Sequence, residues 1–133
     1  MSQSMDIFVD ADEPITTFVL ELESLLDVKF QLRTREGEIW YEYDSSKLVL
    51  TVGEHEFEND GGLNFEDYRY NIALWPINYK TEAEWHKTRN DAAYRIFQQL
   101  KAVQKYHLLL VDDVQVRLAE FSPQPAVPVT TPT

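Results

Sequence analysis

The chain has 133 residues, and its 23 acidic and 12 basic side chains give a formal net charge of −11 at pH 7. One domain is expected at this length. Hydrophobic residues make up 44% of the chain and aromatic residues 13%, which excludes an intrinsically disordered acidic protein, since such proteins are poor in both. The negative charge argues against nonspecific binding to nucleic acid or to anionic lipid, because like charges repel.

The chain contains no cysteine, so disulfide bonds and thiol chemistry are excluded. This composition fits the reducing cytoplasm. No apolar run approaches the roughly 20 residues of a membrane-spanning helix. The N-terminal segment also lacks the basic and apolar regions of a secretory signal. We therefore expect a cytoplasmic protein without membrane contact.

The first half of the chain predicts a strand, a helix and then three strands. Residues 5–9 are apolar and predict a strand, whereas apolar spacings of three and four predict an amphipathic helix over 14–27, with Glu21 and Glu23 facing solvent. Pro14, after two acids, suits the start of that helix. Strict alternation of apolar and polar residues then predicts antiparallel strands over 30–35, 39–44 and 48–52, with turns at Glu36-Gly37 and Asp44-Ser45-Ser46.

The second half of the chain predicts a long polar loop, a strand, a long helix and one or two strands. The loop runs from Glu54 to Asp67, and Asn59-Asp60-Gly61-Gly62 is its clearest signal. Thr81 and Glu84 have the spacing of a capping box that opens a helix. The predicted elements are a strand over 68–75, a helix over 82–105, a strand over 107–111 and a last strand over 114–118. Residues 122–133 hold four of the six prolines and predict a disordered tail.

This order predicts an α+β fold, a two-layer sandwich in which two helices pack on one face of a mainly antiparallel sheet. Residues 1–121 form the predicted domain, and 122–133 the tail. If Tyr41 and Tyr43 face the helices, alternation directs the intervening residues to the opposite face of the sheet. That outer face then carries Trp40, Glu42, Asp44 and Trp75.

Aromatic side chains among carboxylates on an open sheet face indicate a protein-binding surface, since aromatics supply contact area and carboxylates steer a basic partner. A register shift of one residue would instead bring both indoles inside. A homodimer covering this face is a further alternative. A second acidic group follows in the loop and consists of Glu54, Glu56, Glu58 and Asp60. It indicates a negatively charged ridge that binds a basic protein or a divalent cation. The alternative is a loop whose acids are simply solvated.

The sequence shows no catalytic signature. His55, His86 and His107 lack the spacing of metal ligands. Asp112-Asp113 is interpreted as a solvated turn in preference to a catalytic carboxylate pair. The basic residues of the long helix are interpreted as a solvated face that offsets acidic neighbours, in preference to an RNA-binding surface. They are Lys87, Arg89, Arg95, Lys101 and Lys105.

In size, acidity, lack of cysteine and order of elements, the chain resembles immunity proteins of bacterial toxin systems. The resemblance implies a non-catalytic, cofactor-free protein of the bacterial cytoplasm that neutralises a basic toxin such as a nuclease. The surface pattern of Trp and carboxylate residues on the outer face and the loop, and not the resemblance, indicates that these residues bind that partner.

Two other function classes remain open. One is a DNA mimic that inhibits a DNA-binding protein, because the acidic half, residues 1–67, carries seventeen acids and four bases. The other is a small-ligand domain whose pocket lies between sheet and helices. Its lining would consist of Tyr41, Tyr43, Tyr68 and Tyr70.

Overall fold

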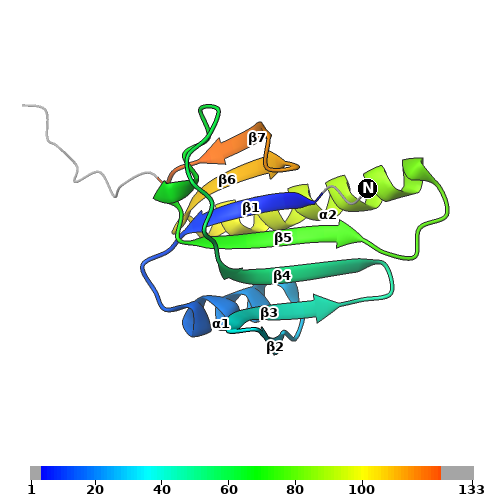
Figure 1. Ribbon diagram of the computed structural model, residues 1–133, viewed down its shortest axis with the longest axis horizontal. Coiled ribbons are helices and arrows are strands. Elements are labelled where there is room, and N and C mark those ends of the chain that lie inside the picture. Colours follow the sequence, from blue (N-terminus) through cyan, green and yellow to red (C-terminus); the bar gives the residue numbers. More distant parts are fainter. Residues whose placement is uncertain (1–3, 124–133) are drawn as a thin grey trace, which may run out of the picture.

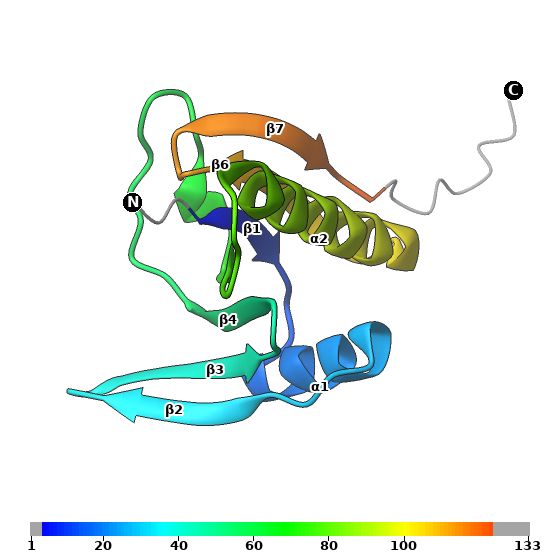
Figure 2. The ribbon, with the colours of Figure 1, turned by 90° about the vertical axis from the view of Figure 1, so that its right-hand side faces the viewer.

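Seven strands form one antiparallel sheet, and two helices cover one of its faces (Figures 1 and 2). The computed structural model describes residues 4–123. The elements are β1 (Met5–Asp10), α1 (Ile15–Leu26), β2 (Gln31–Arg35), β3 (Glu38–Asp44), β4 (Leu48–Glu54), a 3₁₀ turn (Phe65–Asp67), β5 (Tyr70–Pro76), α2 (Glu82–Val103), β6 (His107–Asp112) and β7 (Val116–Phe121). In space the strands follow the order β2-β3-β4-β5-β1-β6-β7.

The predicted α+β class with helices packed on an antiparallel sheet is confirmed. Each predicted helix and strand is present, because hydrophobic period and turn chemistry agree along most of the chain. Of the predicted tail, residues 124–133 lie outside the described part of the chain. Within residues 4–123, no helix combines the length and apolar character needed to cross a membrane.

The helix ends show how local sequence sets the element bounds. The Thr81 hydroxyl accepts the backbone N–H of Glu84 at 3.0 Å, as the predicted capping box requires. The Glu84 carboxylate accepts the N–H of Lys80 rather than that of Thr81, so only half of the box forms. Helix α2 ends where Gln104 adopts a left-handed conformation, and α1 ends in the same way at Asp27.

The turn between β2 and β3 depends on two residues with positive φ. Glu36 has φ 51° and Gly37 has φ 85°, which fits the type I′ geometry of tight hairpins. A Cβ at Gly37 would meet no atom within 4 Å, so a substitution there tests backbone conformation alone.

We expect Gly37→Ala to lower the free energy of unfolding by about 1 kcal/mol, because an L side chain is strained in the left-handed region. Urea unfolding followed by circular dichroism measures the loss. Gly53→Ala is the matched control, since its Cβ would make ordinary contacts of 3.5 Å or more at a position without positive φ. Equal stability of Gly37→Ala and wild type would show that the hairpin uses another turn geometry.

The main core lies between the helices and the sheet. Inward-facing residues of β1, β4, β5 and β6 pack there against both helices. Phe18 of α1 stacks on Tyr70 of β5 with ring centroids 5.2 Å apart, and Tyr106 meets Phe18 edge-on at 5.4 Å. These contacts hold α1 over the sheet although the two helices are joined by four strands.

A second apolar cluster lies on the opposite face of the sheet, beneath residues 55–69, which we call the 55–69 loop. Leu63, Phe65 and Tyr68 of this loop are buried against outward-facing residues of β1 and β6. Phe8 of β1 is at the centre, 4.7 Å from Phe65 between ring centroids. The polar sequence predicted a loop, and the aromatic residues of this loop pack against the outer face of β1 and β6 and cover it.

The interpretation of the α2 basic residues as a solvated face is wrong for Arg89. This side chain is 2% exposed, lies over the Trp85 ring and pairs with Asp112 at 2.9 Å. Asp112 is therefore the partly exposed partner of a buried arginine, at the end of β6. The Glu21 side chain is 41% exposed, as predicted, and it also accepts the Tyr106 hydroxyl; the partly exposed Glu23 accepts the N–H of Phe30.

Candidate functional site

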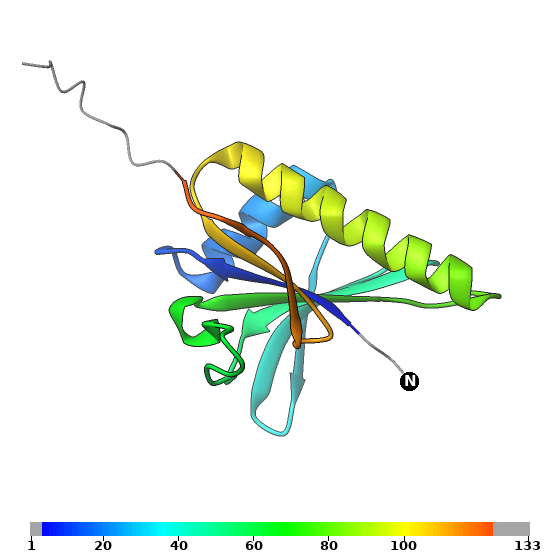
Figure 3. The ribbon, with the colours of Figure 1, turned by 90° about the horizontal axis from the view of Figure 1, so that it is seen from above.

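The 55–69 loop divides the outer face of the sheet into two halves. It covers β1 and β6, and it leaves the outward-facing residues of β2 to β5 open to solvent, which we call the open half. Figure 3 shows the loop and the β2–β3 hairpin on the same side of the sheet, opposite the helices. The outward-facing residues of the open half are Gln31, Arg33, Arg35, Glu38, Trp40, Glu42, Asp44, Val49, Thr51, Gly53, Asn71, Ala73 and Trp75, of which Val49 is buried.

The strand register arranges these residues in rows across the sheet. Asp44, Val49 and Trp75 form one row. The next row runs from Glu42 through Thr51 and Ala73 to Asp6 on β1, and Trp40 lies beside Gly53 in the row after that. The predicted outward direction of Trp40, Glu42, Asp44 and Trp75 agrees with this register. The two tryptophans are half-buried, and the small side chains of Thr51 and Ala73 lie between their rows.

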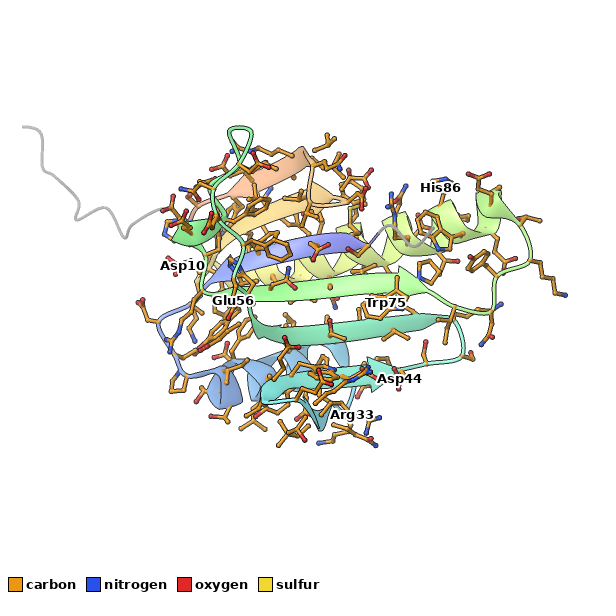
Figure 4. The ribbon with its side chains drawn as sticks, in the orientation of Figure 1. Asp10, Arg33, Asp44, Glu56, Trp75 and His86 are labelled. Carbon is orange, nitrogen blue, oxygen red and sulfur yellow. The ribbon has the colours of Figure 1, made fainter. Side chains whose placement is uncertain are left out.

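Trp40, Glu42, Asp44 and Arg33 form a polar group at the β2–β3 edge of the open half (Figure 4 labels Arg33 and Asp44). The Trp40 indole donates to Glu42 at 3.1 Å. Arg33 lies 3.8 Å from Glu42 and from Asp44, which is beyond hydrogen-bond distance. Partial burial and the neighbouring Glu42 carboxyl raise the pKa of Asp44 above its ordinary value, and Arg33 offsets this only in part. In formal charge, this group sets two carboxylates against one guanidinium.

The loop acids are separated from this group and from one another. Glu56, Glu58 and Asp60 are exposed on the 55–69 loop. In the same segment, the rings of His55 and Phe57 contact Phe8. Figure 4 places Glu56 at the end of the sheet away from Asp44 and Trp75. Glu54 is paired with Tyr70 at the end of β4 and shares its side of the sheet, which is the helix side. The open half and the loop thus contain seven of the eight predicted binding residues, and Glu54 lies on the other face.

Polar contacts fix the 55–69 loop in addition to its aromatic residues. Asn59 and Glu66 exchange two hydrogen bonds of 2.9 Å between side chain and backbone. The Arg117 guanidinium of β7 donates to the Gly62 carbonyl at 2.7 Å, and His55 Nε2 lies 2.7 Å from the carbonyl of Tyr68. The loop therefore presents its acids from a defined position relative to the sheet.

Asp6 is the residue of this face that sequence reasoning missed. It is 3% exposed and accepts hydrogen bonds from Ser4 Oγ at 2.6 Å and from Asn71 Nδ2 at 2.7 Å. Burial raises the pKa of Asp6 above its ordinary value of 3.8, and these two bonds offset only part of the effect. The available signal was a single acid inside the apolar run of β1.

This raised pKa predicts a pH dependence of stability. The folded chain holds the Asp6 proton more tightly than the unfolded chain, so stability falls as pH rises from the ordinary pKa through the raised one. We expect Asp6→Asn to have a higher free energy of unfolding than wild type at pH 7, with the difference shrinking toward pH 4. Urea unfolding at both pH values tests this, and a wild type more stable than the variant at pH 7 would contradict it.

Arg89 was also accessible to sequence reasoning. It lies four residues from Trp85 and four from Ala93, so it occupies the apolar stripe of α2. The charge of Arg89 led to the prediction that its side chain is solvated, whereas its spacing from Trp85 and Ala93 indicates a position facing the core.

Within the described part of the chain, the fold does not bring together the residues of the predicted tyrosine-lined pocket or of a cation site. Tyr68 lies in the outer cluster and Tyr70 in the main core, so the four tyrosines do not line one pocket. Within residues 4–123, no group of three or more His, Asp or Glu side chains could hold a metal ion. A surface depression of about 400 Å³ is bordered by Glu13, Lys105 and Tyr106, whose side chains bond to one another and to Glu21. These contacts tie α1 to the start of β6.

Comparison with known proteins identifies no relative: no protein-family model, curated protein or solved structure matches the chain.

Proposed function

We propose that the chain is a non-catalytic, cofactor-free acidic module that neutralises a basic protein partner, in the manner of a bacterial immunity protein that masks a toxin such as a nuclease in the cytoplasm. The observation that carries this proposal is the Glu42–Asp44 pair beside Trp40, in which two carboxylates share a single nearby guanidinium, that of Arg33, at 3.8 Å from each. A cationic group of the partner would complete the neutralisation that Arg33 leaves unfinished.

The arrangement of the outer face supports this proposal. Acids lie on both sides of the open half: Glu42 and Asp44 on the β2–β3 hairpin, and Glu56 and Glu58 on the 55–69 loop (Figures 3 and 4). Two acidic borders around a floor with exposed indole surface favour a basic partner, since long-range attraction raises the rate of encounter and aromatic contact stabilises the complex.

The DNA-mimic alternative has less support from the geometry. Phosphate mimicry needs acids along one continuous line, whereas the fold places Glu54 on the helix side of the sheet and the other acids on two separate borders. The structure offers no further observation in favour of this alternative.

A homodimer is the second candidate, and one observation favours it. Leu32 and Ile39, on the helix side of the β2–β3 hairpin, are 56% and 63% exposed. A second copy of the chain would cover these side chains. Size-exclusion chromatography with light scattering separates a monomer, as the immunity proposal expects, from this dimer.

The proposal is tested by reversing one charge on each acidic border of the open half. A partner is first isolated from native host lysate at low salt and identified by salt elution and mass spectrometry. We expect Glu42→Lys with Glu56→Lys to lower its association rate constant about tenfold at low salt and to weaken the salt dependence, because electrostatic steering acts on encounter. The free energy of unfolding should fall by about 1 kcal/mol, because Glu42→Lys removes the acceptor of the Trp40 indole, whereas Glu56 is exposed.

Glu82→Lys with Asp91→Lys is the matched control, because it changes the net charge equally at exposed positions of α2. Its association rate constant should remain well above that of the first double variant. If both double variants associate equally fast, the open half is not the interface and the proposed function is wrong in its site.

A further inference from the structure

Asp6 lies at the border between the covered and open halves of the outer face, and its charge has no counterion in the described structure. Among residues 4–123, no basic side chain forms an ion pair with it. Its two hydrogen-bond donors, Ser4 and Asn71, are neutral. A carboxylate that is 97% buried normally has a charged partner, because desolvation without one is costly.

The Asp6 carboxylate is directed toward the open half. Its Oδ2 accepts the side chain of Asn71, which belongs to β5, the neighbouring strand on that side. The cross-strand neighbour of Asp6 on β5 is Ala73, and Thr51 follows in the same row. Both oxygens of Asp6 are already bonded and the residue is 3% exposed, so an incoming donor reaches Oδ2 only by displacing the Asn71 amide that covers it.

We propose that Asp6 is the binding site for one basic side chain of the protein partner, which lies across Thr51 and Ala73 and ends at Oδ2 in place of the Asn71 amide. This inference rests on the proposed function and specifies the central contact of its interface. A lysine or arginine side chain fits the row, since its aliphatic part packs on the Ala73 and Thr51 methyl groups while its charge reaches the carboxylate. In this proposal, the row of small side chains between Trp40 and Trp75, formed by Thr51 and Ala73, is where the partner's side chain binds.

The charges around Asp6 make this contact pH-dependent. Ser4 and Asn71 face it as neutral donors, Asp113 opposes its ionisation, and His55 favours it. A docked cation lowers the pKa that burial has raised, so protons leave Asp6 on binding and affinity increases as pH rises. Acidification should therefore weaken the complex before it unfolds the domain.

The experiment titrates the full chain with a synthetic octa-arginine peptide by isothermal titration calorimetry at low ionic strength, from pH 4.5 to pH 7.5. We expect Asp6→Asn to bind the peptide about tenfold more weakly than wild type at pH 7.5 and to lose most of the pH dependence. Ala73→Leu keeps the carboxylate but obstructs the row, and should weaken binding to a similar extent. Asp91→Asn removes the same charge from α2 and should change the affinity less than twofold.

Each outcome separates this inference from the proposed function. If wild type does not bind the peptide, or if Glu42→Lys binds it unchanged, the proposed interface fails and the role of Asp6 fails with it. If Glu42→Lys weakens binding while Asp6→Asn and Ala73→Leu do not, the interface stands and the assignment of Asp6 is overturned. Circular dichroism and thermal unfolding confirm that each variant is folded before titration.

Discussion

Arg89→Ala is expected to lower the free energy of unfolding by about 3 kcal/mol, the largest loss for any charged side chain described here. The substitution removes the guanidinium that is 2.9 Å from Asp112, the stacking over Trp85 and most of a buried side-chain volume. The loss lies at the low end for a broken buried pair, because the Asp112 side chain is 35% exposed and regains water. Urea unfolding at pH 7 measures the effect.

Lys87→Ala on the same helix is the control. Lys87 pairs with Asp91 at 2.7 Å, but both side chains are mostly exposed, so solvent screens the pair and its removal should cost far less stability than Arg89→Ala. Equal losses for the two variants would show that burial does not strengthen the Arg89 contact. Arg89→Met separates charge from volume, since it refills the site with apolar atoms and should recover part of the loss.

The architecture was predictable from the sequence because its signals are local. Strand alternation, the Glu36-Gly37 turn and the Thr81 cap each act within a few residues, and they agree with one another. The same alternation correctly directed Trp40 and Trp75 to the outer face, since the Tyr41 and Tyr43 side chains join the main core.

The organisation of the outer face was not predictable, because it depends on contacts between distant residues. The sequence of the 55–69 loop is mostly polar. Only the fold shows that Phe65 packs against Phe8, which lies 57 positions earlier in the chain. Asp6 and Arg89 were missed for a related reason: composition assigns charged residues to solvent, whereas their burial is decided by what packs around them.

The two apolar clusters stabilise different parts of the fold. The main core holds the helices to the sheet and fixes the register of Trp40, Glu42 and Asp44. The outer cluster holds the 55–69 loop and with it Glu56, Glu58 and Asp60. The relative position of the two acidic borders therefore depends on the outer cluster, which can be weakened without altering any charge.

Phe65→Ala is expected to lower the free energy of unfolding by about 3 kcal/mol, because it empties a buried aromatic site. Phe65 is 3% exposed, and its ring lies 4.7 Å from Phe8 and 5.6 Å from Phe57 between centroids. The same substitution should release the 55–69 loop, so limited proteolysis should cleave it faster than in wild type. Partner association should slow although the net charge stays at −11, since Glu56 and Glu58 lose their fixed position.

Phe57→Ala is the matched control, because this ring contacts Phe8 and Phe65 but lies outside the buried cluster and is 42% exposed. Its removal should cost about half as much, since less apolar surface leaves the core. Losses of equal size would show that the loop is held by its polar contacts, with Arg117 and Asn59, rather than by Phe65. A slower association of Phe65→Ala together with an unchanged rate for Phe57→Ala would establish that the acidic borders act as a pair only when the outer cluster holds them in place.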